Sequence, residues 1–88
     1  MATRVDRNKR YAQIREILSE HKELTAKEIA TEMMRRGFVP TNERGWAAPR
    51  CTELYNQGEL MLTGKKKDRL TNKWVWMYAL IPKGEKNG

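Results

Sequence analysis

The sequence of 88 residues has one cysteine and one histidine. A single cysteine cannot form a disulfide within the chain, which agrees with a reducing cytoplasm. Zinc sites in proteins use several cysteine and histidine ligands, so one of each argues against a metal centre. We therefore expect no metal and no cofactor.

Long apolar runs are missing as well. No stretch approaches the roughly 18 apolar residues that cross a bilayer, and the first ten residues, MATRVDRNKR, have no apolar signal core. The chain is therefore expected in the cytoplasm, without a membrane partner. Paired carboxylates, a phosphate-binding loop and a nucleophile with a base at suitable spacing are also lacking, so the sequence does not predict an enzyme.

Acidic residues are concentrated in one part of a basic chain, whose net charge is +7. Residues 16–34 contain five Glu and two Lys, whereas residues 1–15, 35–50 and 60–80 contain five, four and five Arg or Lys, each with one acidic residue. An acidic segment between basic ones indicates a molecule with one basic side. Such clusters predict a polyanionic partner, most often nucleic acid. Ordinary solubility is the alternative explanation.

Residues 7–22 have the periodicity of an amphipathic helix. Their apolar side chains recur at intervals of three and four residues and so fall on one helix face. These residues are Tyr11, Ile14, Ile17 and Leu18. Asp6 suits the N-cap, and residues 1–6 are expected to form a flexible arm.

A second helix is predicted over about residues 26–36. Thr25 and Glu28 form a T-x-x-E capping box, in which each side chain accepts a hydrogen bond from the other residue's backbone amide. Gly37 follows two arginines and is a good C-terminal stop. The helix is therefore bounded by local signals at both ends.

The segment TNERGWAAPRCTEL, residues 41–54, combines helical spacing with a glycine and a proline. A proline clashes with the carbonyl four residues earlier, which here belongs to Gly45. Two geometries remain open: a helix kinked at Pro49, or an irregular first turn before a regular helix that starts near Ala48. We expect this third helix to end at Gly58. Its expected core residues are Ala47, Cys51, Leu54 and Tyr55.

The rest of the chain predicts a β-hairpin. ELMLT alternates, and WVWMYALI is rich in aromatic and β-branched residues. Asn72 suits a left-handed turn position between them. Both faces of the second strand are apolar, so the pattern does not decide which face is covered, but Trp74 and Trp76 are expected in the core. Residues 82–88 are predicted to be a disordered tail.

Three helices followed by a basic hairpin are the element order of a winged helix-turn-helix. The expected fold is α+β, with a two-stranded wing, as a single domain over residues 1–81. The segment APRCTELYNQGELMLTGKKKDRLTNKWVWMY resembles the recognition helix and wing of small phage and bacterial winged-helix proteins. In those, an APR-x-x-EL helix leads through a glycine into a strand, a basic turn and an aromatic return strand. The resemblance covers about residues 8–81 and implies DNA binding.

A duplex-DNA interface is therefore predicted on the third helix and the wing. One helix fits a major groove, where Arg, Asn and Glu read base edges, and wing cations suit phosphates or the adjacent minor groove. The predicted DNA-binding residues are Asn42, Arg44, Gly45, Trp46, Pro49, Arg50, Glu53, Lys65, Lys66, Lys67, Arg69 and Lys73. A third contact is assigned, as a hypothesis, to Arg4, Arg7, Lys9 and Arg10.

The leading functional hypothesis is a small phage-type transcriptional regulator or an excision or replication accessory factor that binds double-stranded DNA. The alternative is a protein-interaction module, for example a phage inhibitor of a host protein, with the acidic middle and a patch around Trp46 as its interface. A binder of left-handed DNA or RNA ranks third. Formation of a homodimer is left open. Many such domains bind paired half-sites as dimers, but the sequence has no additional helix with heptad periodicity that would enforce dimerisation.

Overall fold

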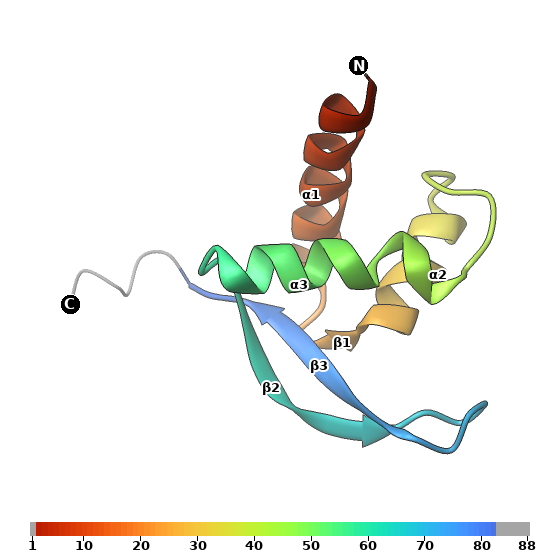
Figure 1. Ribbon diagram of the computed structural model, residues 1–88. Helices are drawn as coiled ribbons and strands as arrows, with labels where there is room; N and C mark the ends of the chain where they lie inside the picture. Colours follow the sequence, from red (N-terminus) through yellow and green to blue (C-terminus); the bar gives the residue numbers. More distant parts are fainter. Residues whose placement is uncertain (1, 83–88) are drawn as a thin grey trace.

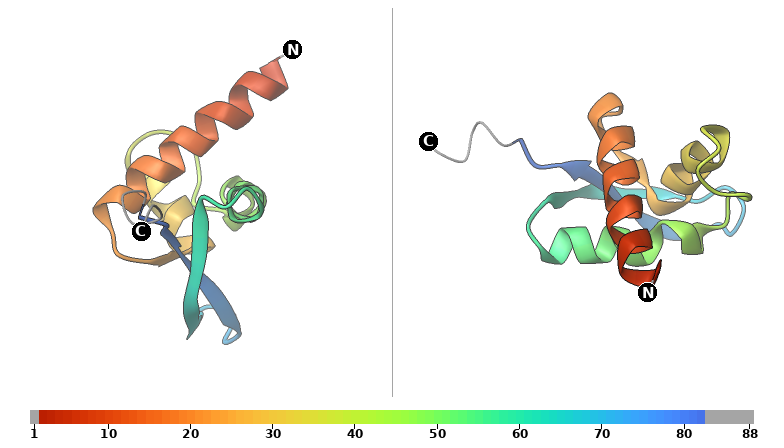
Figure 2. Two further views of the ribbon diagram at one scale, coloured as in Figure 1. Left: turned by 90° about the vertical axis from the view of Figure 1, so that its left-hand side faces the viewer. Right: turned by 90° about the horizontal axis from the view of Figure 1, so that it is seen from above.

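The computed structural model describes residues 2–82, with side chains from residue 7 onward. The described chain belongs to the α+β class, with three α-helices, one short 3₁₀ helix and three strands (Figure 1). In chain order these are α1 (Ala2–Glu20), β1 (Leu24–Thr25), α2 (Ala26–Arg35), η1 (Arg44–Trp46), α3 (Ala48–Asn56), β2 (Leu60–Lys67) and β3 (Trp74–Leu80). The β2–β3 hairpin extends away from the helices (Figure 2).

The sheet has three antiparallel strands in the order β1–β3–β2. The predicted two-stranded hairpin is present as β2 and β3, but the predicted number of strands is wrong, because the sheet contains a third strand. Leu24 pairs with Tyr78 and Thr25 pairs with Met77, so the segment before α2 forms a short third strand against the far edge of β3. A strand of two residues has no alternation for a pattern to reveal, and its partner lies far along the chain.

Helix α1 begins at Ala2, earlier than the periodicity over residues 7–22 indicates. Asp6 therefore lies inside the helix, and its assignment as an N-cap is wrong. The flexibility expected for residues 1–6 stays a prediction, as does the tail, of which residues 83–88 lie outside the described part of the chain.

Helix α2 confirms the capping box. The Thr25 hydroxyl accepts a hydrogen bond from the Glu28 amide at 3.2 Å, and the Glu28 carboxylate accepts one from the Thr25 amide at 2.9 Å. Both backbone donors would otherwise lack a partner at the helix start. At the other end, Gly37 takes a positive φ of 81° after the last helical residues, a conformation that glycine adopts without steric cost.

The sequence leaves two geometries open for the segment around Pro49, and the structure has the irregular first turn in place of the kinked helix. Residues 44–46 form the 3₁₀ helix η1, and α3 starts at Ala48 with Pro49 in its first turn. There the missing amide of proline is not needed for an intrahelical bond. The first regular α-helical bond runs from the Cys51 amide to the Ala47 carbonyl at 2.8 Å. Pro49 therefore starts the helix without breaking it.

The core lies where α1, α2, α3 and the base of the hairpin meet. Its largest fully buried side chains are Ile14, Ile17, Ile29, Met33, Leu54, Leu60 and Cys51. Tyr55, which was expected among them, is 44% exposed, so that expectation is wrong. It lies one residue beyond Leu54, a rotation of about 100° around the helix axis, which moves its side chain from the core to a flank.

None of the helices in residues 2–82 is both long enough and apolar enough to cross a membrane.

Candidate nucleic-acid interface

The outer face of α3 is free of other elements (Figure 1). The residues exposed on α3 are Pro49, Thr52, Tyr55 and Asn56. Gly45, in the preceding turn, is also exposed, and a Cβ atom placed on it would meet no atom within 4 Å. Gly45 and Pro49, two of the predicted site residues, therefore lie on the open surface around the start of α3. The small size of both lets another molecule approach the backbone.

Arg50 and Glu53 lie on the flank of α3 that faces α1. The Tyr11 hydroxyl donates a hydrogen bond to Glu53 Oε1 at 2.6 Å, and Arg50 Nη2 donates to Glu53 Oε2 at 3.0 Å. Only 22% of the Arg50 side chain is exposed, and its Nε atom is buried without a hydrogen-bond partner. The structure therefore separates this pair from the outer face, where the sequence had placed Glu53.

The hydrogen bond to Glu53 also raises the pKa of Tyr11 above its ordinary value, because it favours the protonated phenol. Arg7 approaches the same carboxylate, with its Nε atom 3.9 Å from Glu53 Oε1. Glu53 is thus the shared acceptor that joins α3 to the first helix. In this position it holds Arg50 at the seam between α1 and α3.

Trp46 is half-buried and packs against the core. Its indole Nε1 donates to Thr41 Oγ1 at 2.9 Å, and the Arg10 guanidinium lies 5.4 Å from its ring centroid. Arg10 also donates to the Phe38 carbonyl at 3.3 Å. Trp46 therefore anchors the loop before α3. Asn42, in the same loop, is half-buried too.

Among the cations of the hairpin, Lys66 forms an ion pair, whereas the others form none with a described residue. Lys66 Nζ lies 2.6 Å from Glu28 Oε2, which links β2 to the start of α2. Partial burial raises the pKa of Glu28, but the hydrogen bonds from Lys66 and Thr25 outweigh it and leave that pKa below its ordinary value. Lys66 is therefore an internal contact, unlike its neighbours on the hairpin.

The unpaired cations of the hairpin and of η1 form what we call the basic arc. Its members are Arg44, Lys65, Lys67, Arg69 and Lys73. All five are exposed, and none forms an ion pair with a residue that the structure describes. Five predicted site residues are thus brought together as uncompensated positive charge along the hairpin and beside the start of α3.

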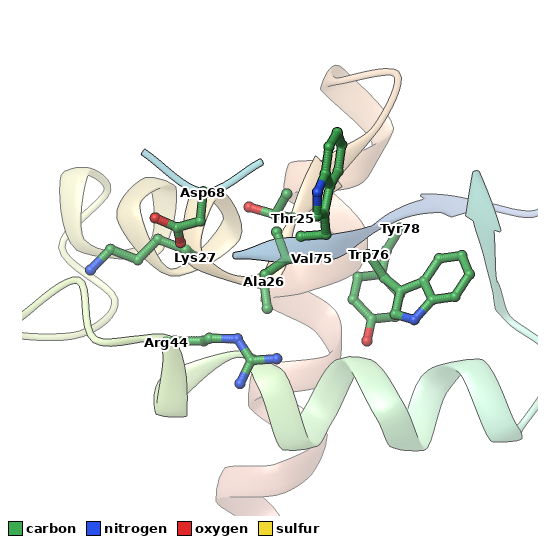
Figure 3. A pocket seen from close by; sticks show the side chains of 9 residues that line it. Thr25, Ala26, Lys27, Arg44, Asp68, Val75, Trp76 and Tyr78 are labelled. Carbon is green, nitrogen blue, oxygen red and sulfur yellow. The ribbon is translucent and has the colours of Figure 1, made fainter. Parts of the chain in front are cut away.

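Arg44 lines an open pocket of about 140 Å³ between η1, the start of α2 and β3. Figure 3 shows its guanidinium directed into the space between β3 and α3, which the rings of Trp76 and Tyr78 also border. Burial raises the pKa of Tyr78, and an interaction with Thr52 on α3 partly offsets this effect. Hairpin and α3 are therefore joined at this point, with a cation beside the junction.

The basic residues predicted as a third contact do not act as one group. The guanidinium groups of Arg7 and Arg10 make the internal contacts described above, whereas Lys9 is exposed. The Arg4 side chain lies outside the described side chains. A third contact through all four residues stays a prediction.

Sequence reasoning missed Thr52 and Tyr55 as surface residues of α3. The exposure of Thr52 could have been predicted, because the apolar stripe of Ala47, Cys51 and Leu54 places Thr52 on the far side of the helix. Cys51 itself is fully buried, and burial raises its pKa to about 12, which disfavours the reactive thiolate form. In the described part of the chain, no group of His, Cys, Asp and Glu is arranged to hold a metal.

Comparisons with protein-family models, with curated protein sequences and with solved structures gave no match to this chain.

Proposed function

We propose that this protein is a winged helix-turn-helix protein that binds double-stranded DNA. In this proposal α2 and α3 are the helix-turn-helix, α3 enters the major groove, and the β2–β3 hairpin is the wing. The two-residue strand β1 is compatible with that fold, because it adds to the sheet without covering α3. The protein would act in the cytoplasm as a small phage-type regulator or an excision or replication accessory factor.

The basic arc is the observation that carries the proposal. An exposed cation without an acidic partner is free to neutralise a phosphate and release a condensed counterion. The arc lies beside a helix whose outer face is bare, and an α-helix of about 10–12 Å diameter fits a major groove about 12 Å wide. Positive charge for the backbone and an open helix for the groove therefore occur together.

The roles of the site residues follow from where the structure places them. Thr52 and Asn56 are the polar side chains on the exposed face of α3 and suit base edges. Gly45 and Pro49 allow the groove wall to come close, and Arg44 suits a phosphate at the helix start. Arg50, which is held by Glu53, is assigned a supporting role in place of direct base contact.

Binding to duplex DNA at two salt concentrations tests the proposal. A 30-base-pair duplex of random sequence, labelled for fluorescence anisotropy, would be titrated at about 50 and 200 mM salt. If four or five phosphates are contacted, affinity should fall on the order of 10² to 10³-fold between these conditions. Lys22→Ala serves as a control, because Lys22 is an exposed cation outside the basic arc, and should bind like the wild type. Absence of binding at the lower salt would refute the proposal.

A second candidate is a protein-interaction module, and one observation favours it. Leu70 is 81% exposed and Trp74 is 64% exposed, both at the outer end of the hairpin. Exposed apolar side chains that lie together are a feature of protein interfaces. Under this alternative a defined protein partner, or a second copy of the chain, would bind the hairpin end, and Lys67, Arg69 and Lys73 would be dispensable.

A further inference from the structure

One face of β3 is apolar along the whole strand, but only the part at the base of the hairpin is covered. At the base, Leu60 is 1% exposed and lies opposite Leu80, which packs against the core together with Tyr78. Further along β3 on the same face, Trp76 is 46% exposed and Trp74 is 64% exposed. The expectation that both tryptophans belong to the core is therefore wrong. The hairpin extends past the helices, and nothing in the described chain covers its outer half.

Each exposed tryptophan has a lysine directly opposite it on β2. Lys65 pairs in register with Trp76, and Lys67 pairs with Trp74. Opposite residues of an antiparallel pair place their side chains on the same face. Lys65 Nζ lies 4.7 Å from the centroid of the Trp76 ring, a cation–π contact. Two aromatic rings and two cations thus share one uncovered surface, which we call the Trp–Lys face.

The turn of the hairpin does not need these tryptophans. It is closed by a hydrogen bond from the Asp68 amide to the Lys73 carbonyl at 2.8 Å and by one from the Asn72 amide to the Asp68 carbonyl at 2.7 Å. The Asp68 carboxylate accepts a further bond from the Leu70 amide at 2.8 Å. Leaving two indoles exposed is unfavourable, because burial of apolar surface stabilises a folded protein by about 25 cal/mol per Å² removed from water. Folding therefore does not explain why the outer hairpin carries them.

The position of the Trp–Lys face connects it with α3. Tyr78 is the next residue on the same face of β3 and packs against the core, and it interacts with Thr52, on the exposed side of α3. Figure 3 shows Trp76 beside Tyr78, on the side of β3 that faces α3. A nucleic-acid strand that leaves a duplex bound at α3 would therefore meet the indoles first and the hairpin lysines beside them.

We propose that the Trp–Lys face binds unpaired nucleotides, so that the preferred ligand is a junction of duplex and single-stranded DNA. This inference rests on the proposed function and names its substrate more closely. Unpaired bases stack on aromatic side chains while cations follow the backbone phosphates. Lysines beside the rings give the surface a charge complementary to a nucleic-acid strand, whereas an apolar protein surface would leave these charges without a partner. Paired bases inside a duplex offer no free ring face for stacking.

The test compares a blunt duplex of 20 base pairs with the same duplex carrying a six-nucleotide single-stranded thymidine tail. The tail should increase affinity at least about tenfold, given the usual strength of base–aromatic stacking. The double variant Trp74→Ala/Trp76→Ala should lose this gain and keep its affinity for the blunt duplex. Leu70→Ala, a more exposed apolar residue of the same turn region, should keep the gain. Tryptophan fluorescence should be quenched by the tailed duplex more than by the blunt one.

The outcomes separate this inference from the proposed function. If the tail adds no affinity, or if the double variant keeps the gain, the Trp–Lys face does not bind unpaired nucleotides, and binding of the blunt duplex alone decides the proposed function. If the tailed duplex binds while the blunt duplex does not, this inference holds and recognition of duplex DNA fails. Capture of a protein partner that requires both tryptophans, with no effect of the tail, also overturns it. Circular dichroism melting shows that each variant is folded.

Discussion

In the helical body most of the described arginine side chains have acidic partners, whereas most cations of the hairpin have none among the described residues. Arg36 Nη2 lies 2.6 Å from Glu20 and its Nε atom lies 3.3 Å from Glu32, so it joins α1 to α2. Arg15 similarly lies 2.7 Å from Glu59 at the start of the hairpin. Arginine presents several donors in a fixed fork and suits such bridges. Charge in the body therefore connects elements, whereas most charge on the hairpin makes no such connection within the described residues.

The largest effect is expected from removing charge on the hairpin. The triple variant Lys67→Ala/Arg69→Ala/Lys73→Ala should lower affinity for duplex DNA by about 10²-fold, because three phosphate contacts are lost. Its melting temperature should stay within about 2 °C of the wild type, since these side chains are exposed and unpaired. Anisotropy titration and thermal melting measure the two quantities. A variant that binds as tightly as the wild type would remove the basic arc from the interface.

The opposite result is expected from Arg36→Ala in the body. Removing the bridge to Glu16, Glu20 and Glu32 leaves three carboxylates close together at the seam of α1 and α2. The melting temperature should fall by about 2–5 °C, while DNA affinity changes less than about twofold. A loss of affinity at unchanged stability would show that body and hairpin are not divided as we describe.

A smaller contrast separates two residues of α3 itself. Arg50→Ala should lower thermal stability, because Glu53 loses a partner at the α1–α3 seam, and should reduce affinity less than about threefold. Asn56→Ala should leave stability unchanged and weaken discrimination between duplex sequences by up to about 10-fold at one base position. Melting curves and competition with selected duplexes distinguish the two. A greater loss of DNA binding in Arg50→Ala than in Asn56→Ala would show that Arg50 contacts the DNA bases directly.

Some of these structural features could be predicted from the sequence alone, and others could not. The capping box at Thr25 and the apolar stripe of α1 were predictable, because both depend on residues within one or two helical turns. The role of Glu53 was not, since its partner Tyr11 lies 42 positions away. The exposure of Trp74 and Trp76 depends on how far the hairpin extends past the helices, which no strand pattern encodes.

The smallest effect concerns pH and the link between hairpin and body. The folded-state pKa of Glu28 lies below its ordinary value of 4.5, so the ionised form is favoured by folding. This contribution to stability is complete above pH 4.5 and is lost as the pH falls through the lower folded-state pKa. Glu28→Gln should therefore destabilise the protein slightly at neutral pH and less at pH 3. Thermal melts over this range check the prediction, and parallel curves for the two proteins would contradict it.

The salt dependence of duplex binding tests the central claim most directly. Titrations of the wild type and of the Lys67, Arg69 and Lys73 triple variant at several salt concentrations give the slope of log affinity against log salt. We predict that the variant's slope is shallower by about 2.7, because each lost phosphate contact contributes about 0.9. Equal slopes for the two proteins would show that the basic arc does not contact DNA.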